Sequence, residues 1–219
     1  MNIFTCKAII FDLDGVLVDS SAVVEKHWQN WADCHNLDMA QILPILHGRR
    51  AVEVMQLVAP HLNVQVEAAQ LSAVEAAETD GLIPVDGAKS LLQALPPKAW
   101  GVATSGTRNI ATARLRASSL PLPEVLVTAD DVQYGKPAPD AYLLAAQKLG
   151  VAPENCLVFE DAPAGIEAAV NAGMHVVALT TSHKYEELLH ANRIIENLSV
   201  VEVVVNDSDS PNRTLQFRI

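Results

Sequence analysis

Two carboxylates close the first apolar run of the chain. Asp12 and Asp14 follow the run 7–11. On an extended strand end, residues two apart point the same way, so both carboxyl groups would face one small volume. Carboxylates that close repel each other unless a cation lies between them. The pattern indicates a metal site in which one carboxylate is the nucleophile and the other shuttles a proton, although a lone Asp-x-Asp is also typical of a solvated turn.

A hydroxyl pair precedes a predicted helix in the middle of the chain. Thr104, Ser105 and Gly106 lie between a strand pattern and a helix pattern. Hydroxyl groups together with the free amides of a helix start make a cradle for an anion. An ordinary N-cap by Thr or Ser is the alternative, and the stretch alone does not decide between the two.

Two further polar stretches follow predicted strands. Lys136, in GKPAPD, offers a compact positive charge suited to a phosphoryl oxygen. Glu160 and Asp161 end one strand and open a helix. Mg²⁺ prefers one or two carboxylates with water and substrate phosphate, so Asp161 could complete a magnesium site with Asp12. A solvated lysine and charges that complement a helix dipole are the alternatives.

Alternating strands and helices must position these residues. Short apolar runs predict buried parallel strands, and helical spacing fills the stretches between them, so we predict an α/β fold with a Rossmann-like, doubly wound parallel sheet. Such sheets bind ligands at the carboxyl ends of their strands. The strands are expected at Lys7–Phe11, Trp100–Thr104, Val125–Val127, Cys156–Glu160 and His175–Leu179, and the helices at Gly87–Leu95, Thr107–Ser118, Pro139–Leu149 and Ala162–Ala172.

One stretch breaks the alternation. From about residue 20 to 84 we find no strand pattern but three helix patterns, at Ser21–Asn36, Ala51–Ala59 and Val66–Thr79. We predict a helical cap domain over residues 20–85, inserted into a core domain of residues 1–19 and 86–219. The tail predicts a hairpin of Val200–Val205 and Thr214–Arg218.

Composition narrows the choice of partners. The 219 residues carry a formal net charge of −11, which disfavours nucleic acid as a partner. We find neither a signal-peptide pattern nor a run of the roughly 20 apolar residues that spans a membrane. Cys6, Cys34 and Cys156 match no zinc or disulfide pattern and are expected to be buried. We expect a cytoplasmic enzyme acting on a small molecule, without a membrane partner and by default a monomer.

Several stretches together resemble a known family. FDLDGVLVDS, HGRR, ATSGTRN, GKPAPDAY and FEDAPAGI are similar to the motifs of the haloacid dehalogenase-like hydrolase superfamily. Within it, the chain looks closest to sugar-phosphate and polyol-phosphate phosphatases of the glycerol-3-phosphatase and 2-deoxyglucose-6-phosphatase type. The resemblance implies a Rossmann-like core with a helical cap inserted after the first motif.

The resemblance also implies residue roles. Asp12 would be the nucleophile, Asp14 the general acid and base, and Lys136 the charge-balancing lysine. The remaining positions would bind metal or substrate. The metal set comprises Asp12, Asp161, Glu160 and the backbone carbonyl of Asp14; Thr104, Ser105 and Gly106 would bind phosphate; and His47, Arg50, Asp19 and Ser20 are candidates for substrate contact.

The expected activity follows from these roles. It is Mg²⁺-dependent hydrolysis of a small sugar or polyol phosphate through an aspartyl phosphate. A sugar phosphomutase of the same superfamily, using the same phospho-aspartate, is the alternative. A metal-free haloacid dehalogenase and a non-catalytic binding protein fit the acidic residues less well.

Overall fold

The computed structural model describes residues 3–206 and 214–218. Its centre is a six-stranded parallel sheet in the order β6-β5-β2-β7-β8-β9. Strand β2 is fully buried, with Phe11 opposite Val102 and Phe159. This confirms the α/β prediction and all five expected strands. The strands are β2 (Ala8–Phe11), β5 (Trp100–Ala103), β6 (Val125–Val127), β7 (Cys156–Glu160), β8 (His175–Leu179) and β9 (Arg193–Ile195).

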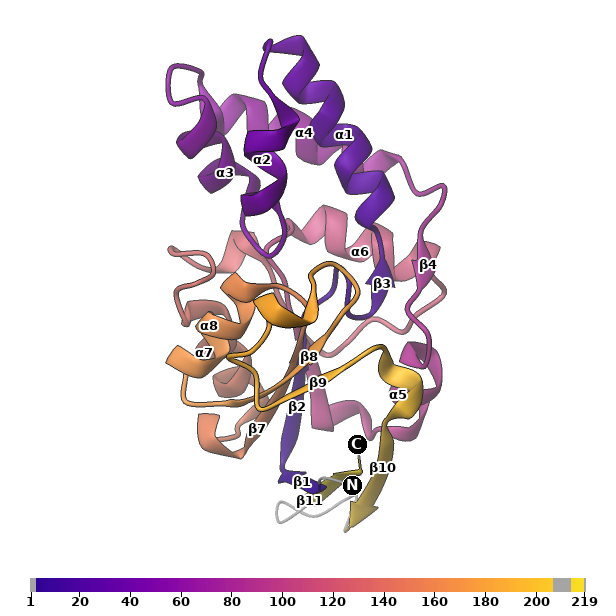
Figure 1. The fold of residues 1–219 in the computed structure, drawn as a ribbon. Helices are drawn as coiled ribbons and strands as arrows, with labels where there is room; N and C mark the ends of the chain where they lie inside the picture. The colour runs from indigo at the N-terminus through magenta and orange to yellow at the C-terminus, as the bar shows by residue number, and fades with distance from the viewer. Residues whose placement is uncertain (1–2, 207–213, 219) are drawn as a thin grey trace.

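Helices cover both faces of the sheet (Figure 1). Because side chains alternate along a strand, Ile9 and Phe11 belong to one hydrophobic cluster while Ala8 and Ile10 belong to another. Helices α5 (Ala88–Ala94) and α6 (Arg108–Ala117) contribute to the first cluster. Helices α7 (Asp140–Leu149) and α8 (Pro163–Asn171) contribute to the second. Short 3-10 turns complete the connections, at Pro97–Ala99, Ala129–Asp131, Pro153–Asn155, Tyr185–Glu187 and Leu198–Val200.

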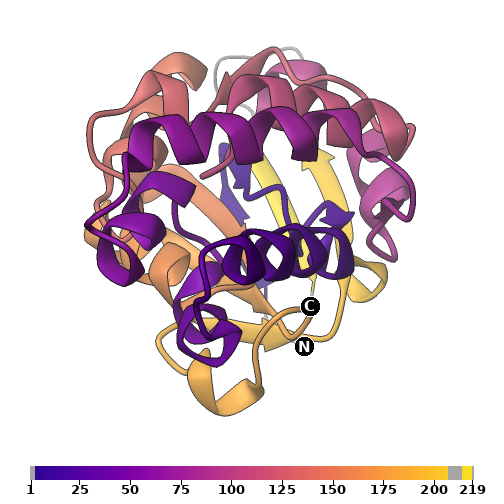
Figure 2. The ribbon, with the colours of Figure 1, turned by 90° about the horizontal axis from the view of Figure 1, so that it is seen from above.

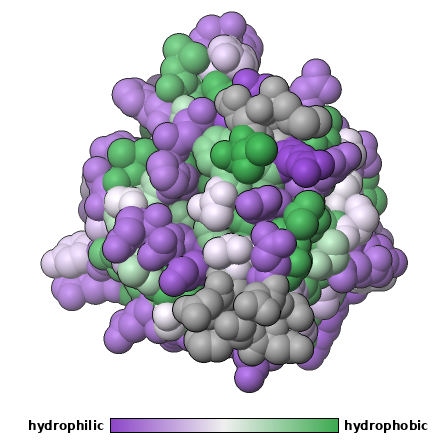
Figure 3. All heavy atoms as spheres, turned by 90° about the horizontal axis from the view of Figure 1, so that it is seen from below, coloured by the Kyte–Doolittle hydropathy of each residue, from purple (hydrophilic) through white to green (hydrophobic). Residues whose placement is uncertain are grey.

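A small antiparallel sheet lies at the end of the core farthest from the cap (Figure 1). It joins β1 (Ile3–Cys6) to the hairpin of β10 (Glu202–Asn206) and β11 (Thr214–Arg218). The predicted hairpin is confirmed, with its connection at 207–213 outside the described residues. Strand β1 was not predicted. Seen from this end, apolar and polar side chains are interspersed (Figure 3).

Four helices form a layer above the strand ends, as Figure 2 shows from above. They are α1 (Ser21–Cys34), α2 (Met39–Leu46), α3 (Ala51–Val58) and α4 (Val64–Ala77). They pack around a hydrophobic cluster of their own that includes Trp28, Trp31 and Met55. Helix α2, which contains Pro44, was missed because proline is a helix-breaking signal. We keep the name cap for residues 20–85; the domain boundaries themselves stay a prediction.

Two short strands link the cap to the core. β3 (Val18–Asp19) and β4 (Ile83–Pro84) pair antiparallel, with Val18 opposite Pro84. The expectation of no strand between residues 20 and 84 is therefore wrong at its end. Two-residue strands are too short to show the period-2 pattern by which strands are recognised.

Two sequence expectations about surface and core have different outcomes. Among the described helices, none has both the length and the apolar character required to cross a bilayer. Cys6 and Cys156 are buried as expected, but Cys34 is exposed. Cys34 lies two positions beyond the buried Ala32 on α1, which turns it about 200° away from the packed face.

Candidate active site

A cavity of about 700 Å³ lies between the carboxyl ends of the core strands and the cap. Asp12, Thr104 and Asp161, each directly after a strand, line its floor. Arg50 and Glu75 line it from the cap. Parallel strands end on the same edge of a sheet, so residues distant in sequence meet there. The structure thus brings the four polar stretches found in the sequence to one place.

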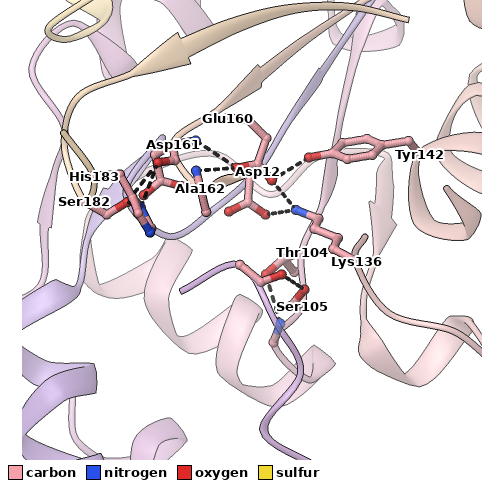
Figure 4. A network of polar contacts seen from close by, with 12 residues as sticks. Asp12, Thr104, Ser105, Lys136, Tyr142, Glu160, Asp161, Ala162, Ser182 and His183 are labelled. Carbon is pink, nitrogen blue, oxygen red and sulfur yellow. Dashed lines mark hydrogen bonds and ion pairs between the residues drawn. The ribbon is translucent and has the colours of Figure 1, made fainter. Parts of the chain in front are cut away.

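Lys136 joins two carboxylates at the bottom of this cavity (Figure 4). Its Nζ donates to Asp12 Oδ1 and to Glu160 Oε1, each at 2.7 Å. All three side chains are nearly inaccessible to solvent. Charges so buried require close partners, which excludes the solvated loop lysine considered from the sequence.

Both oxygens of Glu160 are already held by the protein. Besides Lys136, the Tyr142 hydroxyl donates to Oε1 at 2.8 Å. The backbone amides of Asp161 and Ala162 donate to Oε2 at 2.8 and 3.0 Å. With two donors on each oxygen, Glu160 is suited to hold Lys136 and the start of the Asp161 turn in place.

The carboxylates of this cluster could hold a divalent cation. Carboxylate oxygens of Asp12, Glu160 and Asp161 lie within 4.8 Å of one another, and all three residues are buried. The group contains three carboxyl groups and one ammonium, so two negative charges remain to be balanced when all three carboxyl groups are ionised. Oxygen ligands at this spacing suit Mg²⁺. Because Glu160 is occupied by hydrogen-bond donors, Asp12 and Asp161 are the better direct ligands.

Gly15 makes room for this acidic group. Its φ of +75° lies in the left-handed region, and a Cβ there would lie 1.9 Å from Asp161 Oδ2. A side chain at position 15 would therefore displace the Asp161 carboxylate as well as strain the backbone. The turn after β2 and the turn after β7 can approach each other because residue 15 is glycine.

Burial shifts the ionisation of the cluster. It raises the pKa of Asp12 to about 7, with Lys136 opposing the rise and Glu160 adding to it. Burial, Glu160 and Asp12 together raise the pKa of Asp161 well above its usual value. Burial also opposes the charge on Lys136, but the carboxylates of Asp12 and Glu160 outweigh it and raise the pKa of the ammonium. Carboxyl groups whose pKa is raised by burial and by neighbouring negative charge favour a nearby cation, because the cation stabilises their ionised form.

Thr104 and Ser105 differ in what their hydroxyls do. The Thr104 Oγ1 accepts a hydrogen bond from the Gly106 amide at 3.0 Å, which leaves its proton for another acceptor. The Ser105 Oγ donates to the carbonyl of Gly48, in the cap, at 2.8 Å. Helix α6 is capped by Thr107, so neither Thr104 nor Ser105 serves as its N-cap.

Asp14 lines the same cavity, but its carboxylate is bound elsewhere than at Lys136. Ser20 Oγ donates to its Oδ1 at 2.6 Å, and Arg114 Nη1 lies 2.6 Å from its Oδ2. The other terminal nitrogen of Arg114 binds Glu75 Oε2, from the cap, at 2.7 Å. Among the described residues, the group that could hold a metal includes Asp12 but not the side chain of Asp14.

The remaining candidate residues differ in whether they line the cavity and in what they contact. His47 lines the cavity, with its ring 5.8 Å from that of His183. Arg50 also lines it, but its guanidinium donates to the carbonyls of Val132 and Gln133, at 3.2 and 3.0 Å. Asp19 is exposed on β3, and the structure does not bring it to the cavity.

Sequence reasoning missed several residues of the site. Arg114 and Glu75 lie on the buried faces of their helices, four residues after Ile110 and Leu71 respectively. A charged residue at an apolar position of a helical pattern is a readable signal, because such residues are buried only when paired. Tyr142 carried no such signal, since a tyrosine on a buried face is ordinary.

Comparisons with known proteins agree with this geometry. A model of the haloacid dehalogenase-like hydrolases matches residues 6–173. Hexitol phosphatase A of Escherichia coli is 40% identical over 203 residues, 90% of this chain and 94% of its own. Glycerol-1-phosphate phosphohydrolase 1 of Saccharomyces cerevisiae is 35% identical over 189 residues, 80% and 75% of the two chains. The crystal structure of a hydrolase from Pseudomonas syringae matches with a TM-score of 0.78 and 32% identity, over 88% of this chain and 94% of that one.

Proposed function

The chain belongs to the haloacid dehalogenase-like hydrolases, and we propose that it is a Mg²⁺-dependent phosphatase of small sugar or polyol phosphates that works through an aspartyl phosphate on Asp12. One observation carries the proposal: Lys136 lies 2.7 Å from Asp12, inside a buried group of three carboxylates at the floor of a cavity. A nucleophile, its counter-charge and oxygen ligands for a cation are thus close enough to act on one phosphoryl group.

Asp12 attacks phosphorus in this proposal. Lys136 holds Oδ1 and keeps the carboxylate in place, and Glu160 holds Lys136 in turn. Asp12 and Asp161 would hold the Mg²⁺, with the carbonyl of Asp14 as a further protein ligand. When bound, the cation offsets the repulsion between the carboxylate and the phosphoryl oxygens. The new bond joins phosphorus to the Asp12 carboxylate as the ester P–O bond breaks.

In this proposal Asp14 acts first as a general acid and then as a general base. Its carboxyl gives a proton to the departing alkoxide, which leaves as the alcohol. It then takes a proton from the water that attacks the aspartyl phosphate, which frees Asp12 and releases inorganic phosphate. Ser20, at 2.6 Å from Asp14, helps to hold the carboxyl in the cavity wall.

The turn after β5 binds the phosphoryl oxygens. The Thr104 hydroxyl has its proton available, since its oxygen already accepts from the Gly106 amide. We therefore assign the hydroxyl contact to Thr104. The backbone amide of Ser105 would supply a further donor as negative charge spreads over the phosphoryl oxygens.

The substrate class rests on the relatives and the cavity. The similar proteins are named as phosphatases of a hexitol phosphate and of glycerol 1-phosphate. A cavity of about 700 Å³ suits a molecule of that size. We place His47 and Arg50 among the residues that face the alcohol part of the substrate. Asp19, exposed and outside the cavity, is not carried forward as a contact.

We also propose a cytoplasmic, monomeric enzyme without a nucleic-acid or membrane partner. The three cysteines are free thiols, which suits a reducing compartment. Light scattering of the purified protein tests the monomer, and fractionation of cells tests the compartment.

A phosphate-release screen tests the function. The purified protein is offered a panel of hexose, pentose, hexitol and glycerol phosphates with Mg²⁺, and inorganic phosphate and sugar phosphates are both measured. We expect stoichiometric phosphate and free alcohol from at least one polyol or sugar ester. An isomeric sugar phosphate without free phosphate would instead indicate a phosphomutase, and no turnover of any ester would refute the proposal.

A further inference from the structure

Three charged side chains, two of them buried, connect the core to the cap. Arg114, on core helix α6, lies 2.6 Å from Asp14 Oδ2 and 2.7 Å from Glu75 Oε2. Glu75 comes from cap helix α4. Arg114 is 3% exposed and Glu75 is 7% exposed, so water competes little for the ion pair between them, whereas Asp14 is partly exposed towards the cavity. All three residues line the cavity.

These ion pairs fix the orientation of the Asp14 carboxyl group. Each oxygen of Asp14 has its own partner, Ser20 on Oδ1 and Arg114 on Oδ2. A planar guanidinium with two terminal nitrogens imposes a direction on both carboxylates that it joins. The position of Asp14 therefore depends on Arg114, and that of Arg114 depends on Glu75.

We propose that Arg114 is a positioning residue for Asp14 and that Glu75 completes its position from the docked cap. The inference rests on the proposed function, in which Asp14 protonates the leaving group. The arrangement ties the orientation of the proton donor to the packing of α4 on α6, and so to a cap that covers the cavity.

A simple cap-to-core fastening is the competing explanation. Other contacts already fasten the cap without touching Asp14: Ser105 to Gly48 at 2.8 Å, and Ser72 to Thr107 at 2.8 Å. Arg50 adds its hydrogen bonds to the carbonyls of Val132 and Gln133. The ion pairs of Arg114 differ from these contacts because one of them is made directly with Asp14.

The leaving group distinguishes the two explanations. An alkoxide is a strong base and leaves well only if it receives a proton as the P–O bond breaks. p-Nitrophenolate is a weak base that leaves as the anion and requires no proton. A residue that acts through Asp14 therefore lowers kcat/KM more for alkyl esters than for p-nitrophenyl phosphate, whereas a residue that only supports the fold lowers both alike. This constant covers the steps up to departure of the alcohol and leaves out hydrolysis of the aspartyl phosphate, which both esters share.

The experiment compares kcat and KM for two esters with Mg²⁺ present. They are p-nitrophenyl phosphate and the best alkyl phosphate from the screen, with sorbitol 6-phosphate as the first trial. The variants are Arg114→Gln, Arg114→Lys and Glu75→Gln. Matched controls are Arg116→Gln, on the exposed side of α6, and Glu78→Gln, a partly exposed carboxylate just after α4 and outside the cavity lining.

We expect Arg114→Gln to lower the alkyl-to-aryl ratio of kcat/KM by about tenfold or more, up to the roughly 10²–10⁴ that general acid catalysis contributes. Arg114→Lys should recover part of the ratio because it keeps the charge. Glu75→Gln should lower the ratio less, since its amide oxygen still accepts a hydrogen bond. Both controls should keep the wild-type ratio.

If Arg114→Gln lowers kcat/KM equally for both esters, Arg114 only supports the fold and the inference is overturned. Wild-type values of kcat/KM for both esters would overturn it as well. If Arg114→Gln does not fold, Arg114→Lys and Glu75→Gln decide by the same ratio, and wild-type values in both overturn the inference. Failure of the wild-type protein to release phosphate from either ester is a different result, because it refutes the phosphatase assignment itself.

Discussion

The cavity contains two charged clusters that are built in different ways. The inner cluster, Asp12, Lys136, Glu160 and Asp161, comes from turns of the core alone. The outer cluster, Asp14, Arg114 and Glu75, joins the core to the cap. The geometry of the inner cluster is therefore complete without the cap, whereas the outer cluster exists only where α4 packs on α6. Under the proposed function, phosphoryl transfer to Asp12 would be preorganised by the core alone, and protonation of the leaving group would depend on the cap.

The largest effect is expected at Asp12, the proposed nucleophile of the inner cluster. Asp12→Asn keeps the shape of the side chain and an acceptor for Lys136, but an amide does not attack phosphorus. We expect phosphate release to fall by more than about 10³-fold while the fold is retained. Steady-state phosphate release measures it, with the exposed Asp86→Asn as the control. Residual turnover within tenfold of wild type would remove Asp12 from its role.

The next effect is on stability, again in the inner cluster. Lys136→Met leaves Asp12 and Glu160 buried without their counter-charge, and breaking such a pair costs about 3–5 kcal/mol. Urea unfolding at neutral pH measures this free energy. Lys148→Met, which loses a partly exposed ion pair of 3.8 Å with Asp131, should change it by less than about 1 kcal/mol. Similar losses in the two variants would contradict the account of the inner cluster.

Magnesium should act on the inner cluster and not on the outer one. Chelation should abolish activity, and added Mg²⁺ should restore it. At about 100 times its Kd, Mg²⁺ should raise the free energy of unfolding by about 2.7 kcal/mol. Thermal unfolding measures the gain, which Asp161→Asn should largely lose and Glu75→Gln should keep. If Na⁺ at matched ionic strength stabilises the protein equally, the site is not a specific one for a divalent cation.

The smallest effect concerns pH and the outer cluster. Burial, opposed by Arg114, raises the pKa of Glu75 from 4.5 to about 7. Between those values the folded protein keeps a proton that the unfolded chain releases, so the free energy of unfolding falls as the pH rises through this window. Glu75→Gln mimics the neutral form and lacks this loss. Urea midpoints at about pH 5 and pH 7.5 should show wild type losing on the order of 1 kcal/mol relative to the variant. A difference that does not change with pH would mean that Glu75 is ionised throughout the window.

The two clusters also differ in how far the sequence predicts them. In the inner cluster, Asp12 and Asp161 directly follow buried strands, Glu160 ends one, and Lys136 lies in the loop after β6. Continuous apolar runs such as 156–159 identify buried strands well. Because strand ends converge on one edge, the order of motifs along the chain was enough to predict that they meet.

The outer cluster depends on how helices α4 and α6 pack against each other, and no local sequence pattern predicts that packing. The helix patterns were found, yet which face of α4 meets which face of α6 follows from the whole cap. For the same reason the sequence could not show that Ser105 and Arg50 bind carbonyls across the boundary between cap and core. The β3–β4 pair was missed because segments of two residues carry too little periodicity, and edge strand β9 was missed as well.

Gly15 has a consequence for how the protein tolerates change. It has no side chain, yet the space beside its Cα is filled by the carboxylate of Asp161. Even a single methyl group at this position would compete with a ligand that belongs to a turn some 150 residues away in the chain. In a saturation scan, the position should therefore be as intolerant as the nucleophile itself, and its failures should be traceable to lost cation affinity in otherwise folded molecules.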